Sequence, residues 1–145
     1  PKLMDARIFV DAPMNIRAEM LERPLAERLV YDPTQNIFFL DFAGLSVRSA
    51  ADIERIRDGV DAFLAPIGHK VNAIVNYDRF SIVPELIDDY IAMVKGVMER
   101  HYHDVTRYTS NTFLRMKLGE ALEKRQIQPQ LYESAAEAQG SLAKH

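Results

Sequence analysis

Hydrophobic residues recur at helical spacing in three stretches of the chain, and this pattern predicts three helices. The first, Ser49–Leu64, opens on a variant of the capping box in which Asp52 stands where Glu or Gln is usual. The second begins at Pro84 and carries a broad apolar stripe as far as Met98. In the third, over residues 111–125, we expect the apolar residues to face inward: Phe113, Leu114, Leu118, Ala121 and Leu122.

Short runs of β-branched and aromatic residues separate these helices and predict strands. Glu27–Asp32 and Asn36–Phe42 flank a turn that contains Pro33, so they predict an opening hairpin. Further strands are expected at Val71–Tyr77, Asp104–Thr109 and Gln130–Tyr132. A full capping box then opens a terminal helix that runs from Ser134 through Leu142.

Strands that alternate with helices predict a small α/β fold with a mixed sheet. The opening hairpin contributes an antiparallel edge, and parallel β-α units with right-handed crossovers follow it. Val71–Val75 is the most apolar strand available to lie between the helices at 53–64 and 86–98. We therefore expect Ile74 and Val94 to be buried.

The composition fits one globular domain, because the 145 residues include 48% hydrophobic and 27% charged side chains. Residues 1–26 contain Pro1, Pro13 and Pro24 without a sustained period, so we interpret them as a connector to an upstream domain, with one helical turn around Ile16–Leu21. Residues 27–145 are then the α/β domain. The absence of cysteine excludes thiolate zinc sites and thiol nucleophiles, and it fits a cytoplasmic location.

The charge pattern argues against two classes of partner. Lys and Arg number 18 against 21 Asp and Glu, for a formal charge of -3, so nucleic-acid binding is not expected. No apolar run approaches the roughly 20 residues that span a bilayer, so no membrane partner is expected either.

The usual catalytic and cofactor motifs do not occur in the sequence. The glycines form no phosphate-binding loop, and no serine lies in a GxSxG setting. Asp88 and Asp89 are adjacent on a helix and diverge by about 100°, while His101 and His103 would need a third metal ligand. We therefore expect no catalytic residue, no metal and no cofactor. The methionines are expected to be core and filler residues.

A candidate binding site follows from position alone. Ligands of open α/β sheets gather at the carboxyl ends of parallel strands, where two polar loops are expected here. The candidate residues are Asn76, Asp78, Arg79, Thr109, Ser110 and Asn111. Both loops precede helix N-termini, which favour anions, so Arg79 with Ser110 and Asn111 would hold a phosphate or a partner's carboxylate. The alternative is that Ser110 or Asn111 caps the helix and Arg79 is solvated.

Two resemblances add expectations about function. The runs NIFFLDF, VNAIVNYD and LYESAAEAQGSL resemble the anti-sigma-factor-antagonist (STAS, or SpoIIAA-like) fold over residues 27–143. That group's regulatory members carry an Asp-Ser-Ser-Gly-Leu segment with a phosphorylated serine, where this chain has Phe80-Ser81-Ile82-Val83-Pro84.

The runs KLMDARIF, VNYDRFSI and VTRYTSNTFLRMKLGEAL look like the C-terminal extension of long bacterial acyl-CoA:acetate/3-ketoacid CoA-transferases of the propionate type. This likeness implies an accessory domain that contributes to assembly or regulation. Its partner would be the upstream catalytic domain, which carries the glutamate of the glutamyl-CoA thioester; a homo-oligomer is left open. The alternative is an independent STAS-type regulatory or protein-binding module.

Overall fold

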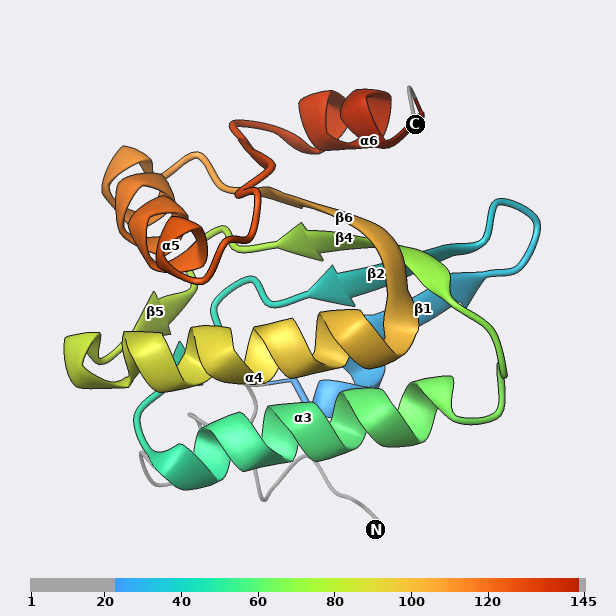
Figure 1. The fold of residues 1–145 in the computed structure, drawn as a ribbon, viewed down its shortest axis with the longest axis horizontal. Coiled ribbons are helices and arrows are strands. Elements are labelled where there is room, and N and C mark those ends of the chain that lie inside the picture. Colours follow the sequence, from blue (N-terminus) through green and yellow to red (C-terminus); the bar gives the residue numbers. More distant parts are fainter. Residues whose placement is uncertain (1–22, 144–145) are drawn as a thin grey trace, which may run out of the picture.

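A mixed five-stranded sheet forms the centre of the molecule, in a computed structural model that describes residues 23–143 (Figure 1). β1 (Leu29–Asp32) and β2 (Ile37–Asp41) pair antiparallel, and every other neighbouring pair in this sheet is parallel. The predicted α/β class, the opening hairpin and the parallel strands after it are therefore confirmed. In spatial order the strands are β1 (Leu29–Asp32), β2 (Ile37–Asp41), β4 (Val71–Asn76), β6 (Tyr102–Tyr108) and β7 (Leu131–Tyr132).

Three helices cover one face of the sheet, and the last helix covers part of the other (Figure 1). The first face carries α3 (Ala50–Leu64), α4 (Ile87–His101) and α5 (Thr112–Lys124), and the second carries α6 (Ala135–Ala143). Each parallel strand is added on the same side of the one before it. Right-handed crossovers then place every crossover helix on the same face.

The expectation that a strand lies between two helices is therefore wrong. α3 and α4 pack side by side, and β4 lies beneath them. Ile74 is buried as predicted, but on the other face, against Ala138 and Leu142 of α6. Val94 is only half-buried, and it lines a small gap between α3, α4 and the strands beneath them.

The beginning of the domain differs from the predicted strand at 27–32. Leu25–Arg28 form a 3-10 turn, η1, after Pro24, and β1 begins only at Leu29. The guanidinium of Arg28 is buried and donates to the carbonyl oxygens of Asp41 and Ala43, at 3.0 and 2.8 Å. Residues 1–22, which include most of the expected connector and its helical turn, lie outside the described residues.

A second, two-stranded sheet was not expected from the sequence. β3 (Ser46–Val47) and β5 (Ser81–Ile82) pair in parallel, and η2 (Pro84–Leu86) then leads into α4. Two residues are too few to show an alternating pattern. The hydroxyls of Ser46 and Ser81 also lie 3.0 Å apart.

The predicted helix caps are present. Ser49 Oγ accepts from the backbone N–H of Asp52, at 3.3 Å, while the Asp52 carboxylate accepts from the N–H of Arg48. Ser134 Oγ accepts in the same way from the N–H of Glu137, at 3.2 Å. These bonds satisfy N–H groups that the helices themselves leave without partners.

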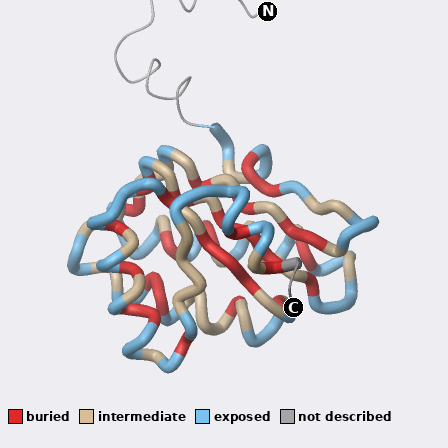
Figure 2. Tube along the Cα trace, turned by 90° about the horizontal axis from the view of Figure 1, so that it is seen from above, coloured by how far each residue is buried: buried red, intermediate tan, exposed pale blue. Residues whose placement is uncertain are grey.

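The core fills the space between the sheet and α3, α4 and α5 (Figure 2). Leu114, Leu118 and Leu122 contribute to it as predicted, but Phe113 is 64% exposed. Phe113 is rotated about 100° around the helix from Leu114, so it turns away when the leucine stripe faces the sheet. Met116 is also exposed, at 49%, and is not the core residue that we expected.

Candidate functional site

The two candidate loops meet at the carboxyl edge of the sheet. β4 and β6 are neighbours, and Asn76 pairs with Tyr108 at their ends. One carboxylate oxygen of Asp78 accepts from both the backbone N–H and the hydroxyl of Ser110, at 2.7 and 3.2 Å. The sequence therefore predicted correctly that these loops form one surface.

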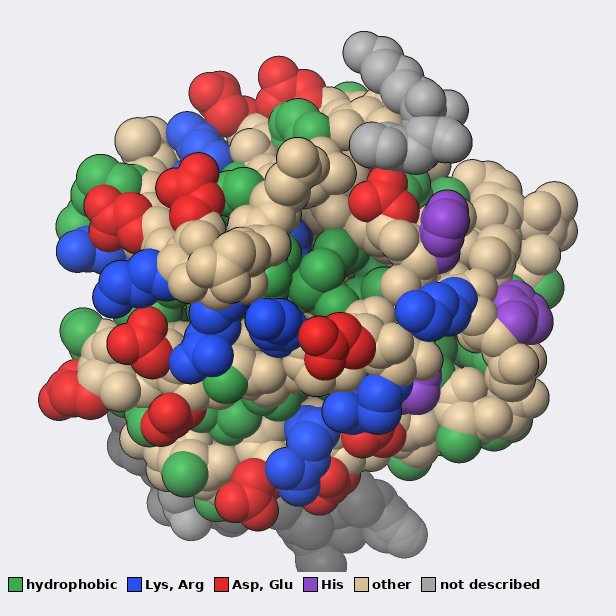
Figure 3. All heavy atoms as spheres, in the orientation of Figure 1, with side chains coloured by type: hydrophobic (Ala, Val, Ile, Leu, Met, Phe, Trp, Pro, Cys, Tyr) green, Lys and Arg blue, Asp and Glu red, His purple; other side chains and the backbone are tan. Residues whose placement is uncertain are grey.

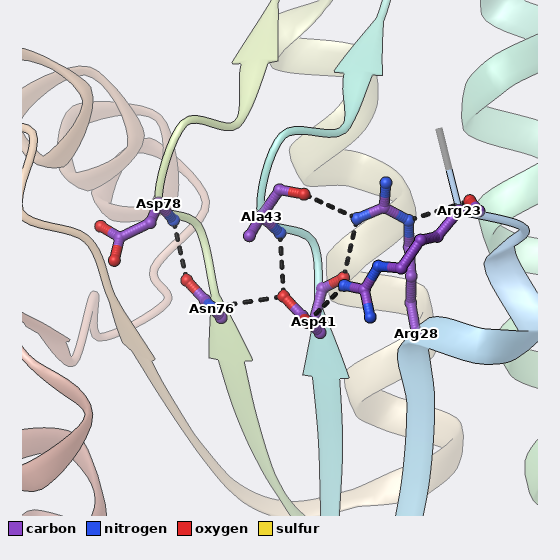
Figure 4. A network of polar contacts seen from close by, with 6 residues as sticks. All are labelled: Arg23, Arg28, Asp41, Ala43, Asn76 and Asp78. Carbon is purple, nitrogen blue, oxygen red and sulfur yellow. Dashed lines mark hydrogen bonds and ion pairs between the residues drawn. The ribbon is translucent and has the colours of Figure 1, made fainter. Parts of the chain in front are cut away.

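A polar network extends from these loops across the sheet edge (Figure 4). Asn76 donates to the carboxylate of Asp41 at 3.2 Å, and its own side-chain oxygen accepts from the N–H of Asp78 at 2.9 Å. Arg23 forms an ion pair with Asp41 at the other end. Hydrogen bonds thus connect the first described residue of the chain to Ser110, through three neighbouring strand ends.

Asp41 is the charged centre of this network. Its partial burial alone would raise the pKa of the carboxyl group. Hydrogen bonds from Arg23 and from the N–H of Ala43, together with the charges of Arg23 and Arg28, outweigh burial and lower that pKa below its usual value. Asp41 is therefore an ionised structural acceptor at neutral pH.

The proposed anion-binding groups are used locally. Asn111 caps α5 by accepting from the N–H of Leu114 at 3.0 Å, and Ser110 is bonded to Asp78. Arg79 is exposed, with φ of 56°, and makes no hydrogen bond or ion pair with any other residue in the described part of the chain. Thr109 is buried, and its hydroxyl accepts from the N–H of Asn111 at 3.1 Å. A phosphate at this place would meet the negative charge of Asp78, so binding of an anion here stays a prediction.

A groove opens beside the same edge, between the start of α4 and the length of α5. Its volume is about 640 Å³, within the range of pockets that hold small ligands. Phe80, Ile82 and Ile87 line one wall, while α5 supplies the other wall. The sequence reading missed this groove because it placed Phe113, which also lines it, in the core.

A buried arginine was also missed. Arg107 of β6 is 2% exposed and donates to the carbonyl oxygen of Pro129 at 2.9 Å. The hydroxyls of Tyr77 and Tyr90 lie 2.8 Å apart, and a second nitrogen of the Arg107 guanidinium donates to Met98 Sδ at 3.5 Å. The only sequence signal for this cluster was an arginine within the strand predicted at 104–109.

The tyrosines of this cluster are not bases. Burial raises the pKa of Tyr77 and, still further, that of Tyr90, so both hydroxyls stay protonated at neutral pH. Burial lowers the pKa of Arg107, while the tyrosines around it act in the opposite direction. We interpret the cluster as a structural one that joins β6, α4 and the segment before β7.

The histidines do not converge on a metal site. His101 Nε2 lies 2.8 Å from Asp61 Oδ1, and Arg100 binds both oxygens of the same carboxylate. His103 is exposed. Within residues 23–143, no three His, Asp or Glu side chains are grouped in a way that would hold a metal ion.

The glutamates of residues 23–143 offer no enclosed nucleophile. Every glutamate in the described part of the chain is exposed, and Asp88 and Asp89 are exposed on the first turn of α4. An exposed carboxylate is fully solvated, which leaves it a weak nucleophile.

No helix among residues 23–143 has the length and apolar character needed to cross a bilayer.

Comparisons with protein-family models, curated proteins and solved structures find no match to this chain. The α/β fold and the geometry of the sheet edge are therefore the structural basis for the functional argument.

Proposed function

We propose that this chain is a non-catalytic accessory domain of an acyl-CoA:acetate/3-ketoacid CoA-transferase, in which it contributes to assembly or regulation. The sequence resemblance suggests the parent enzyme. The observation that carries the accessory role is the exposure of every described glutamate. CoA transfer through a glutamyl thioester needs a carboxylate held in a pocket that orients the thioester and excludes water.

The sheet edge supports the same role. Its polar groups bond to one another, from Arg23 through Asp41 and Asn76 to Ser110, as structural hydrogen bonds do. An upstream domain would join the chain on the N-terminal side of Arg23, whose side chain forms an ion pair with Asp41 at the sheet edge. We place the parent enzyme in the cytoplasm, since the chain has no cysteine and CoA chemistry is intracellular.

The activity test uses the purified chain. Incubated with acetyl-CoA and propionate, it should form no propionyl-CoA, and mass spectrometry should find no CoA adduct on any glutamate. Turnover or a thioester adduct would overturn the accessory role. The parent is tested separately, because the complete reading frame should encode a CoA-transferase upstream of this chain.

The groove beside α5 favours an alternative function, an independent STAS-type regulatory or protein-binding module. Its volume of about 640 Å³ and its apolar wall suit a bound side chain of another protein. A reading frame that starts at this chain, without a transferase in front of it, would support this alternative.

A further inference from the structure

The outer surface of α5 combines exposed apolar groups with charges. Within residues 23–143, the large hydrophobic side chains that are strongly exposed are Val30, Phe113 and Met116, and two of these belong to α5. Phe113, Lys117, Glu120 and Lys124 follow one another at spacings of four, three and four residues. This spacing places them in a single stripe along the helix, which we call the α5 stripe.

The charges of the α5 stripe are available to another molecule. Lys117, Glu120 and Lys124 form no ion pair with any residue that the structure describes, and Glu120 and Lys124 are exposed. The ammonium of Lys117 lies 5.6 Å from the centre of the Phe113 ring. Basic, acidic and hydrophobic side chains are interspersed over this part of the surface (Figure 3).

The balance of charge around the groove argues against a strongly charged partner. Two positive and two negative side chains line the groove. The positive ones are the two lysines of the α5 stripe, and the negative ones are Glu120 and Asp88. A strongly acidic or strongly basic partner would therefore gain from half of these charges and be repelled by the other half. A partner with the same alternation of charge would place a carboxylate opposite Lys117 and an ammonium opposite Glu120.

We propose that the α5 stripe binds a second copy of this chain, with the two α5 helices packed antiparallel. A two-fold axis between Leu118 and Gly119 places Lys117 opposite Glu120 of the second copy. Symmetry repeats this pair, so two ion pairs form at the centre of the contact. The inference does not depend on the proposed function, because it uses only the surface of α5.

At each end of the two paired α5 helices, the proposed contact involves the groove. The symmetry that joins Lys117 to Glu120 also brings Phe113 opposite Lys124 of the second copy, beside Ala121. Lys124 and Ala121 line the groove at the C-terminal end of α5. The exposed aromatic ring of each copy therefore enters the apolar groove of the other and leaves water, which supplies the non-polar part of the binding energy.

The dimer should be weak. One pair of thirteen-residue helices gives a contact at the small end of the range for specific interfaces, and such contacts are transient. We expect a reversible equilibrium between monomer and dimer, with the dimer appearing as concentration rises from micromolar to millimolar. Added salt should weaken it, since its central pairs lie at the surface.

The test is sedimentation equilibrium of the purified chain and of charge variants over that concentration range. Lys117→Glu and Glu120→Lys each turn two attractive pairs into two repulsive ones, so each should weaken dimerisation by roughly tenfold or more. The double variant, K117E with E120K, restores opposite charges across the axis and should return to within a few-fold of the native chain. Glu54→Lys makes the same charge change as Glu120→Lys at an exposed position of α3. It is the matched control and should leave dimerisation unchanged.

Circular dichroism and thermal melting keep the test independent of folding, because the substituted side chains lie on the surface and the variants should melt as the native chain does. Phe113→Ser should abolish the dimer without unfolding the monomer. A chain that stays monomeric up to millimolar concentration overturns the proposal. So does a double variant that associates no better than its single parents, since the antiparallel pairing requires the rescue.

Discussion

The hydrogen-bonded tyrosines beneath α4 provide a quantitative test of the core. The hydroxyls of Tyr77 and Tyr90 lie 2.8 Å apart, and both side chains are buried. Tyr77→Phe removes one hydroxyl and leaves the Tyr90 hydroxyl without that partner. Tyr90→Phe leaves the Tyr77 hydroxyl without the same bond.

The free energies follow from these partners. A buried polar group that loses its hydrogen-bond partner costs about 1–3 kcal/mol. Tyr77→Phe and Tyr90→Phe each deprive one buried hydroxyl of its partner, so each should reduce the free energy of unfolding by about 2 kcal/mol. In the double variant the Tyr77–Tyr90 bond is removed from both sides. Its cost should therefore fall short of the sum by about 1 kcal/mol.

Urea denaturation of the four proteins measures these differences as changes in the midpoint at constant slope. The control is Tyr31→Phe, which removes a hydroxyl that is half-buried and bonded at 2.7 Å to Asn36. This change should cost about 0.5–1.5 kcal/mol. If the Tyr77 and Tyr90 substitutions add without coupling, or if neither costs more than the control, the hydrogen bond between the two buried tyrosines does not stabilise the core as argued.

Further predictions concern the sheet edge and α5. Because folding lowers the pKa of Asp41, its ionised carboxylate stabilises the fold at pH values above the ordinary pKa of 3.8. This stabilisation is lost as the pH falls through the lowered pKa of the folded protein. Asp41→Asn should abolish this part of the acid dependence of unfolding, and it should cost about 1 kcal/mol at neutral pH. Asp78→Ala should cost about 1–2 kcal/mol in urea and move the amide NMR signal of Ser110. Leu122→Ala should cost about 2–5 kcal/mol, whereas Phe113→Ala should change the stability of the monomer by under about 0.5 kcal/mol; equal costs would contradict the orientation of α5.

The sequence predicted the elements where local physics decides them. Helical spacing identified α3, α4 and α5, and the Ser49 and Ser134 capping boxes marked helix starts within one or two residues. The α/β class followed from the alternation of strands and helices. The meeting of the Asp78 and Ser110 loops followed from one topological rule about parallel strands, which needs no side-chain detail.

Sequence reasoning failed where the answer depends on tertiary packing. Helical spacing shows that α3 and α4 each have an apolar face, but it does not show which face of the sheet receives them. Phe113 and Leu114 are equally apolar, and only the position of α5 at the margin of the sheet decides which one is buried. Arg107 reads as a surface residue because its acceptor, the carbonyl of Pro129, is far from it in the sequence.

The two proposed contacts, at the sheet edge and at the α5 stripe, would use separate parts of the surface. Arg23 lies at the β2 end of the polar network, whereas α5 begins beyond its β6 end, and adjacent strands are about 4.8 Å apart. An upstream domain attached through Arg23 and a second copy bound to the outer face of α5 would therefore approach from different sides. Because they need different residues, Asp41→Asn should leave the dimer intact, and Phe113→Ser should leave the Arg23 contact intact. An accessory domain with both contacts would join two copies of a parent enzyme without taking part in its chemistry.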